Sequence, residues 1–262
     1  MAEPSPRLES PAIADGLTED RWLGGRLTLL QPKRGHRVGT DAALLVATAG
    51  ARQGRIVDVG AGVGAVGLAL AKRSESASAD LVEIDPALAA LAERNAALNG
   101  LAAQARVLRL DALVPKERRE AGLAQSADCV VTNPPYFDAA TVRASSDVGR
   151  ARAHILGEAG LAYWIESSLA MLAPQGRFVM IHRPEALSVI LAAIGNRLGA
   201  VALMPVHPAV GASAHRLLVS GVKGSKAPLR IAPGLILHGP DGRLTAEADA
   251  IHRGERLIDW GG

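Results

Sequence analysis

The chain has 262 residues, a hydrophobic content of 48% and a net charge of +3, which suit a globular protein with a substantial core. No apolar run approaches the ~20 residues of a membrane helix, and residues 1–20 are acidic and proline-bearing, so we expect neither a membrane protein nor a secretory signal. The single cysteine, Cys129, argues against a disulfide framework or a thiolate metal cluster and favours a reducing, cytoplasmic setting.

The first segment predicts a mobile tail over residues 1–17, a short strand over 26–31 and a helix over 42–49. Thr40 or Asp41 is the expected N-cap of that helix. Between strand and helix lies a loop with four basic or imidazole side chains, Lys33, Arg34, His36 and Arg37. Such a loop can bind phosphates or can be a solvated surface loop, and the residues leave both interpretations open.

A glycine-rich turn follows the next strand, Ile56–Val59, and precedes a helix expected over 65–72. Strand, tight turn and helix N-terminus in this order are typical of a nucleotide site. A G-x-G-x-x-G match at Gly62, Gly64 and Gly67 would indicate a dinucleotide, but Gly67 falls well inside the predicted helix. Asp58, just before the glycines, would also repel a pyrophosphate. It better suits S-adenosylmethionine, which carries an ammonium and a sulfonium and no phosphate.

Two further acids occupy the ends of the next strands. The strand over 80–85 ends in two acids, Glu83 and Asp85, and Glu83 lies 23 residues after Gly60, the approximate separation at which a carboxylate accepts hydrogen bonds from ribose hydroxyls. Asp85 is expected to be the N-cap of a helix over 86–99 that Gly100 closes. Asp111 ends the strand over 105–110 and can accept from the adenine amine. The predicted cofactor site comprises Thr40, Asp58, Gly60, Ala61, Gly62, Glu83, Ile84, Asp111, Ala112 and Asn133.

The stretch Asn133-Pro134-Pro135-Tyr136 follows an apolar, β-branched strand over 127–132, so it lies at a strand's carboxyl end, where open α/β sheets bind ligands. The two prolines fix a rigid extended loop without N–H donors, and Asn133 adds a side-chain carbonyl. Together they can accept both protons of a planar NH2 group while Tyr136 stacks on the ring that carries it. The bland alternative is a strand followed by a stiff turn.

The second half of the chain is less informative. Residues 137–156 have little periodicity and are long for a connection, which is typical of functional or mobile loops. The remaining expected elements are helices over 161–172 and 185–198, a strand over 177–182, an antiparallel strand pair over 200–204 and 216–222, and an irregular tail with one short helix over 246–253. The seven histidines never fall at close metal-ligand spacing, so we expect no metal site.

These motifs carry a resemblance to class I S-adenosylmethionine-dependent methyltransferases and, within them, to the bacterial tRNA N6-adenine methyltransferases that act on valine tRNA. The residues that carry it are Asp58 to Gly62, Glu83, Asp111, Asn133 to Tyr136, Gln31-Pro32, Gly39 to Ala42, Lys223-Gly224 and Gly242 to Glu247. The resemblance implies a Rossmann-like α/β fold, with a seven-stranded, mostly parallel sheet, helices on both faces and an antiparallel last strand. His36 departs from the Tyr or Phe common at that position, which puts a stacking role there in doubt.

The resemblance also implies a function and a division of the chain. Asn133 and Pro134 would hold the N6 amine of an adenine in tRNA, or in another structured RNA, and Tyr136 would stack on the base. The expected substrate contacts are Pro135, Tyr136, Phe137, Lys33, Arg34, Arg37, Arg150 and Arg152. The expected segments are the tail over 1–17, a strand, basic loop and helix capping the site over 18–50, a methyltransferase core over 51–223, and a C-terminal extension packed on the core over 224–262. None of this indicates an oligomeric state.

Three alternatives stay open. Release-factor methyltransferases use the same motif on a protein glutamine, but they typically carry a separate helical N-terminal domain that this chain lacks. Guanine-N2 methylation of ribosomal RNA would more often place Phe where Tyr136 stands. From a different class, the protein can be an NAD-dependent oxidoreductase or a catalytically silent RNA-binding module.

Overall fold

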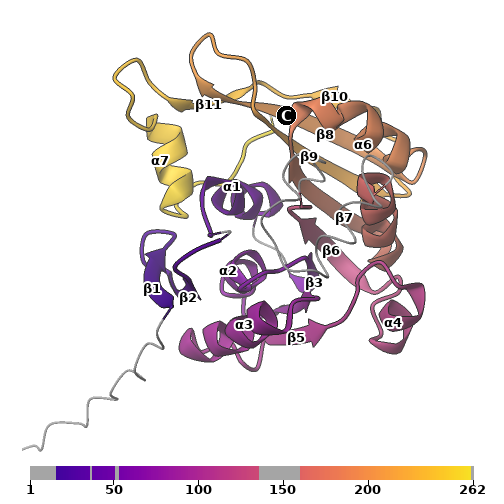
Figure 1. The fold of residues 1–262 in the computed structure, drawn as a ribbon. Coiled ribbons are helices and arrows are strands. Elements are labelled where there is room, and N and C mark those ends of the chain that lie inside the picture. Colours follow the sequence, from indigo (N-terminus) through magenta and orange to yellow (C-terminus); the bar gives the residue numbers. More distant parts are fainter. Residues whose placement is uncertain (1–15, 36, 51–52, 136–159, 261–262) are drawn as a thin grey trace, which may run out of the picture.

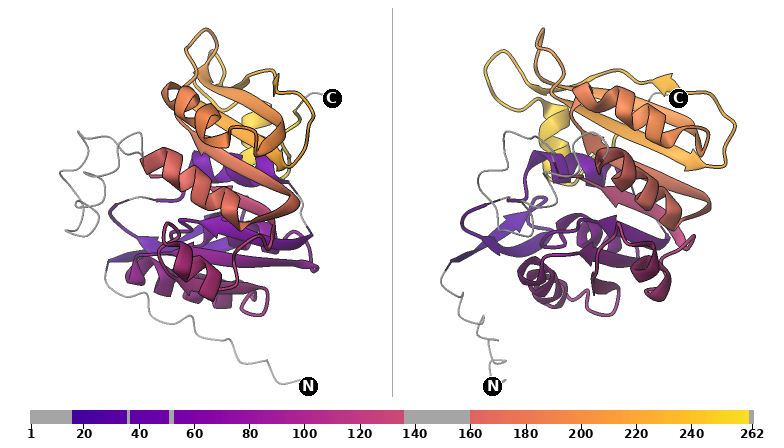
Figure 2. Two further views of the ribbon diagram at one scale, coloured as in Figure 1. Left: turned by 90° about the vertical axis from the view of Figure 1, so that its right-hand side faces the viewer. Right: turned by 45° about the vertical axis from the view of Figure 1, so that its right-hand side comes forward.

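A mostly parallel β-sheet runs through the centre of the molecule and carries helices on both faces (Figures 1 and 2). The computed structural model describes residues 16–35, 37–50, 53–135 and 160–260. The parallel strands are β3 (Gly54–Val59), β4 (Ala77–Glu83), β5 (Ala105–Arg109), β6 (Ala127–Thr132) and β7 (Leu172–His182). Most side chains of β3, β4 and β6 are buried because helices cover both faces of the sheet, whereas those of β5 at the edge are partly or fully exposed.

The strand order is β5–β4–β3–β6–β7–β9–β8. The chain builds outward from β3 to β5 and then returns to β6, so the order reverses between β3 and β6. β9 (Arg216–Lys223) lies antiparallel between β7 and β8 (Leu198–Ala209). The predicted mostly parallel sheet with an antiparallel last strand is therefore confirmed, but two further short strands that pair with β8 bring the number of strands from the predicted seven to nine. Its reversal point brings the glycine turn after β3 beside Asn133 after β6.

Alternating side chains of the strands form two core layers. Ile56, Cys129 and Ile181 belong to the layer that packs on the first three helices, whereas Val57 and Phe178 belong to the opposite layer. The first face carries α1 (Thr40–Ala49), α2 (Ala65–Ala71) and α3 (Pro86–Leu98). The second carries the helix at residues 160–171 and α6 (Leu187–Ile194).

Several predicted elements need correction. The helix expected over 185–198 is a 3-10 turn, η2 (Pro184–Ala186), followed by α6, which ends before Gly195 because that residue has a φ of 53°. The C-terminal tail was expected to be irregular, but β10 (Arg230–Ile231) and β11 (Leu235–His238) pair in parallel with β8. The helix α4 (Pro115–Glu120) was not predicted, whereas the short C-terminal helix is confirmed as α7 (Ala246–His252).

An antiparallel hairpin, β1 (Leu17–Trp22) and β2 (Leu27–Pro32), docks on α3 through two asparagine side chains. Asn95 exchanges hydrogen bonds with the backbone of Leu30 at 2.7 and 3.0 Å, and Asn99 does the same with Thr28 at 2.9 and 2.7 Å. The amide groups thereby replace a strand neighbour on one edge of the hairpin. Asn95 also donates to the carbonyl of Val63, which ties the hairpin to the glycine turn.

Candidate active site at the carboxyl ends of the strands

The glycine turn after β3 adopts a backbone that other residues rarely adopt. Gly60, Gly62 and Gly64 have φ angles of 73°, 57° and 85°. The N–H groups of Gly60 and Ala61 both donate to the Val82 carbonyl, at 2.9 and 3.0 Å, which fixes the turn to β4. A side chain added at Gly62 would meet no atom within 4 Å, so the turn has an open side where a ligand can approach the backbone.

Asp58 lies under this turn with 3% of its surface exposed. Its Oδ2 accepts a hydrogen bond of 2.8 Å from the N–H of Gly67, which lies inside α2, as the sequence predicted. Burial raises the pKa of Asp58 from 3.8 to about 7; the Gly67 hydrogen bond opposes this rise and the negative charge of Glu83 adds to it. A cationic group nearby would stabilise the ionised form.

Glu83, at the end of β4, is held across the glycine turn. Its Oε2 accepts from the N–H of Gly62 and its Oε1 from the N–H of Asp85, each at 2.8 Å. Each carboxylate oxygen has a second lone pair, so the group can still accept from hydroxyls of a ligand. The neighbouring Ile84 side chain is 47% exposed, although it is apolar, and offers a hydrophobic surface beside the carboxylate. Asp85 is the N-cap of α3, as predicted, and accepts from Ala87 and Leu88.

The end of β5 is similarly ordered. Asp111 is 9% exposed and its Oδ1 accepts from the N–H of Leu113 at 3.0 Å, while its own N–H donates to Glu117 of α4 at 2.7 Å. The buried guanidinium of Arg118 donates to the carbonyl of Ala112. The three acids predicted from the sequence therefore lie at the ends of three neighbouring strands, β3, β4 and β5.

Asn133 and Pro134 follow β6 directly. Within the described part of the chain, the Oδ1 atom of Asn133 is buried and accepts no hydrogen bond. Leaving a buried acceptor unpaired costs about 1–3 kcal/mol, so a donor is expected there. Pro134 is buried and Pro135 is exposed. Tyr136 and Phe137 lie outside the described residues.

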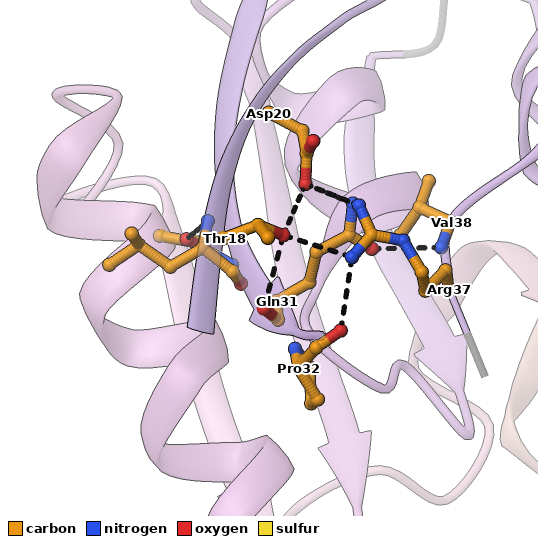
Figure 3. A network of polar contacts seen from close by, with 8 residues as sticks. Thr18, Asp20, Gln31, Pro32, Arg37 and Val38 are labelled. Atoms are coloured by element: carbon orange, nitrogen blue, oxygen red, sulfur yellow. Dashed lines mark hydrogen bonds and ion pairs between the residues drawn. The ribbon is translucent and has the colours of Figure 1, made fainter. Parts of the chain in front are cut away.

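The basic loop divides into two parts. Lys33 and Arg34 are exposed, as phosphate-binding residues would be. Arg37 instead forms an ion pair of 2.7 Å with Asp20 and donates to Thr18 Oγ1 and to the Pro32 carbonyl (Figure 3). A phosphate would compete with Asp20 for Arg37. Arg150 and Arg152 lie outside the described residues.

Two neighbours of Arg37 complete this network. Gln31 donates to Asp20 at 2.8 Å and accepts from the N–H of Val38 at 3.0 Å (Figure 3). The loop is thereby held against the β1–β2 hairpin on both sides of the position of Arg37.

The expected N-cap of α1 is wrong. The helix begins at Thr40 with Gly39 as its N-cap, and no side chain caps it. Asp41 instead pairs with Arg216 of β9, whose Nε donates to the two carboxylate oxygens at 3.0 and 2.8 Å. The ion pair joins two elements 175 residues apart in sequence and so could not be found from local capping rules. Thr40 stays a predicted cofactor contact.

Sequence reasoning missed Thr132 and Trp164. The Trp164 Nε1–H donates to Thr132 Oγ1 at 2.9 Å, and Thr132 Oγ1–H donates to the Val59 carbonyl at 2.8 Å. Both bonds depend on tertiary contacts between separate elements. No signal in the local sequence indicates them.

These features fit S-adenosylmethionine. An open glycine turn, a buried Asp58 that a cation would stabilise, and Glu83 and Asp111 with acceptor oxygens match a ligand with an ammonium, a ribose and an adenine. The same acids disfavour the pyrophosphate of NAD. In the described ranges, no group of three His, Cys, Asp or Glu side chains is placed to bind a metal. None of the helices described combines the length and apolar character of a bilayer-spanning helix.

Proteins that are similar in sequence are also methyltransferases by name. The tRNA1(Val) (adenine(37)-N6)-methyltransferase of Dickeya chrysanthemi (strain Ech1591) is 31% identical over 229 residues, which cover 83% of this chain and 86% of that protein. The protein of the same name from Flavobacteriaceae bacterium (strain 3519-10) is 28% identical over 157 residues, and the match spans 63% of its length.

Solved structures share the fold. A predicted O-methyltransferase of Agrobacterium tumefaciens has a TM-score of 0.69 and 32% identity, covering 83% of this chain and 98% of that one. The 16S rRNA N2 G1207 methyltransferase of T. thermophilus, in complex with AdoMet and guanosine, has a TM-score of 0.53 and 23% identity, covering 79% and 50% of the two chains. The model of the methyltransferase small domain family matches residues 35–185, more than half of the chain. The chain therefore belongs to the methyltransferase small domain family, together with the tRNA1(Val) (adenine(37)-N6)-methyltransferases.

Proposed function

We propose that the protein transfers a methyl group from S-adenosylmethionine to the exocyclic N6 amine of an adenine in tRNA. The observation that carries this proposal is the buried Oδ1 of Asn133, which accepts no hydrogen bond from any residue that the structure describes and which lies after β6 next to the glycine turn after β3. An acceptor that is buried without a partner is suited to a donor that arrives with the substrate.

Each acid of the site has a distinct role in holding the cofactor. Asp58 stabilises the ammonium through neighbouring backbone groups or water, Glu83 accepts from the ribose hydroxyls, and Asp111 accepts from the adenine amine. Ile84 and Ala112 supply apolar contact to the adenine, while Gly60, Ala61 and Gly62 allow close approach of the backbone. Thr40, at the start of α1, is a further cofactor contact in this proposal. When bound, S-adenosylmethionine supplies an activated methyl group.

The substrate amine is held by acceptors alone. Asn133 Oδ1 and the Pro134 carbonyl accept its two protons, which turns the nitrogen lone pair out of the ring system and toward the methyl donor. Pro135 keeps the loop rigid, and Tyr136 and Phe137 stack on the base. Most of the rate enhancement comes from orienting two reactants, and no dedicated general base is needed because the amine becomes acidic only as it is methylated.

A pair of acceptors also discriminates among substrates. An NH2 group satisfies both Asn133 and Pro134, whereas a hydroxyl has one proton and would leave one acceptor unpaired. This favours N-methylation over the O-methylation predicted for the Agrobacterium tumefaciens protein. Adenine N6, guanine N2 and a glutamine amide all satisfy the pair, and the relatives' names favour adenine in tRNA.

RNA contacts come from the exposed side of the basic loop. Lys33 and Arg34 bind the phosphate backbone, together with Arg150 and Arg152. An anticodon-loop adenine is already unpaired, so it enters the site with little unstacking cost. A tRNA substrate places the protein in the cytoplasm. The core that does the chemistry spans residues 51–223, capped by 18–50 and supported by 224–262.

The proposal is tested by incubating the purified protein with labelled S-adenosylmethionine and unmodified valine tRNA, then identifying the methylated nucleoside by mass spectrometry. We expect N6-methyladenosine in wild-type reactions. We also expect Asn133→Ala to reduce turnover about 100-fold, because one substrate acceptor is lost. Release factor and ribosomal RNA serve as competing acceptors. Label in either of these instead of tRNA, or full activity of Asn133→Ala, would contradict the proposal.

A further inference from the structure

We propose that Trp164 is a positioning residue that, through Thr132, sets the distance between the amine-binding residues Asn133 and Pro134 and the glycine turn after β3. The inference rests on the proposed function, because it concerns how the two reactants are aligned. Thr132 immediately precedes Asn133, and Val59 immediately precedes Gly60. Whatever joins Thr132 to Val59 therefore joins the two halves of the site.

A chain of two hydrogen bonds makes this connection. Thr132 pairs with Val59 across the β3–β6 ladder, and its side chain adds a bond of 2.8 Å to the Val59 carbonyl. The hydroxyl uses its one proton for this bond and accepts the indole N–H of Trp164 at 2.9 Å. Thr132 is fully buried, so the hydroxyl has no water with which to replace either partner.

The same indole also packs against the glycine turn. A Cβ placed on Gly60 would lie 3.1 Å from Cζ2 and 3.2 Å from Cη2 of Trp164, so the ring occupies the space that the absent side chain leaves. Nε1, Cζ2 and Cη2 belong to one edge of the indole. A single rigid ring edge thus contacts the end of β6 and the turn after β3, the two places where substrate and cofactor are held.

The consequence for catalysis follows from the geometry of methyl transfer. Reacting atoms must approach to about 3–3.5 Å in line, and a misplacement of about 1 Å costs on the order of 100-fold. Losing the indole N–H or the Thr132 hydroxyl leaves every proposed substrate and cofactor contact in place but loosens the spacing between them. Turnover is therefore expected to fall while affinity for either ligand is kept.

The first test measures turnover on tRNA. We expect Thr132→Val and Trp164→Phe each to lower kcat about 10-fold with KM for S-adenosylmethionine and tRNA changed less than about 2-fold, and Thr132→Ser, which keeps the hydroxyl, to recover most of the loss. The double variant should resemble the single variants, because the pair acts as a unit. Ser168→Ala is the matched control. It removes a partly buried hydrogen bond of 2.9 Å to the Trp164 carbonyl on the same helix and should leave kcat unchanged.

The second test needs no methyl acceptor and so separates this inference from the proposed function. In 15N-labelled protein, Thr132→Val should shift both the Trp164 indole N–H signal and the Asn133 side-chain amide signals, and Ser168→Ala should shift neither. If the Asn133 signals are the same in wild type, Thr132→Val and Trp164→Phe, the pair does not position Asn133, whatever the enzyme methylates. If the wild-type protein were inactive on tRNA but the variants showed these shifts, the proposed substrate would be wrong and the positioning role would be supported.

Discussion

Asp58 shows how burial at one residue links the site to solution conditions. Its carboxyl is almost fully buried and accepts a hydrogen bond from the backbone N–H of Gly67. Burial outweighs that bond and raises the pKa to about 7, above the value of 3.8 expected for the unfolded chain. Between these values the folded protein binds a proton that the unfolded chain releases, so folding becomes less favourable as the pH rises.

We therefore expect Asp58 to contribute stability that is fully present below about pH 4 and lost as the pH rises to about 7. Comparison of wild type with Asp58→Asn isolates this contribution, because the amide oxygen keeps an acceptor for Gly67 and does not titrate. The difference between their free energies of unfolding should change in favour of Asp58→Asn by about 1.4 kcal/mol per pH unit between pH 5 and 6.5. Urea denaturation across this range measures it. Parallel pH profiles would mean that Asp58 is ionised throughout.

At the level of single residues, the sequence predicted the three acids of the site but not the groups that hydrogen-bond to them or the pair Thr132 and Trp164. Asp58, Glu83 and Asp111 could be located because each stands at the end of a recognisable apolar strand. Their hydrogen bonds to Gly67, Gly62 and Leu113 were not predictable, because these depend on the path of each turn. Trp164 lies 32 residues from Thr132 and on another element, so neither strand periodicity nor capping rules connect them.

The β1–β2 hairpin and the basic loop after it contain basic side chains in two different environments. Arg37 holds the loop to the hairpin through Asp20, Thr18 and Pro32, whereas Lys33 and Arg34 are exposed. The hydrogen bond from Thr18 is the main cause that lowers the pKa of Asp20, with Gln31 and Arg37 contributing in the same direction. Neighbouring basic side chains in one loop thus have different tasks.

We expect Arg37→Gln to lower the free energy of unfolding by about 1 kcal/mol, a modest cost because the ion pair with Asp20 is about one-third exposed. Lys33→Ala and Arg34→Ala should change stability by less than about 0.5 kcal/mol. Each should instead reduce the slope of log affinity for tRNA against log salt by about 0.7. Thermal melts and binding titrations at several salt concentrations separate these effects. An Arg37→Gln variant with unchanged stability and a reduced salt slope would show that Arg37 contacts RNA after all.

Elements were predictable where local signals were strong. The strand over 127–132 matches β6 because a β-branched run ends at two prolines, and α3 begins at Pro86 because Asp85 caps it. The strands β10 and β11 were missed because two and four residues show no periodicity, and prolines and glycine surround them. Their strand conformation comes from pairing with β8, which is a tertiary effect.

On the scale of the whole molecule, the C-terminal extension belongs to the same hydrophobic core as the cofactor half. Ala248, Ile251 and Ile258 are buried with residues of α1, α2 and the sheet. The N–H of Ile258 donates to the Ala47 carbonyl of α1 at 3.0 Å, and Figure 1 shows α7 beside α1. The extension therefore packs against α1, the helix that Asp41 joins to β9.

This arrangement predicts that the extension and the core unfold together. Ile251→Ala removes a fully buried side chain and should lower the free energy of unfolding by about 2–5 kcal/mol in a single cooperative transition. Val210→Ala, at a side chain 67% exposed on the β8–β9 hairpin, should change it by less than about 0.5 kcal/mol. Urea denaturation followed by circular dichroism and by the Trp164 indole N–H signal of 15N-labelled protein tests this, because the Trp164 signal reports on the helix at residues 160–171 and circular dichroism on the whole chain. If Ile251→Ala instead produced an early transition that left the Trp164 signal unchanged, the extension would be an independent unit; coincident transitions mean that α7 stabilises the fold around the active site.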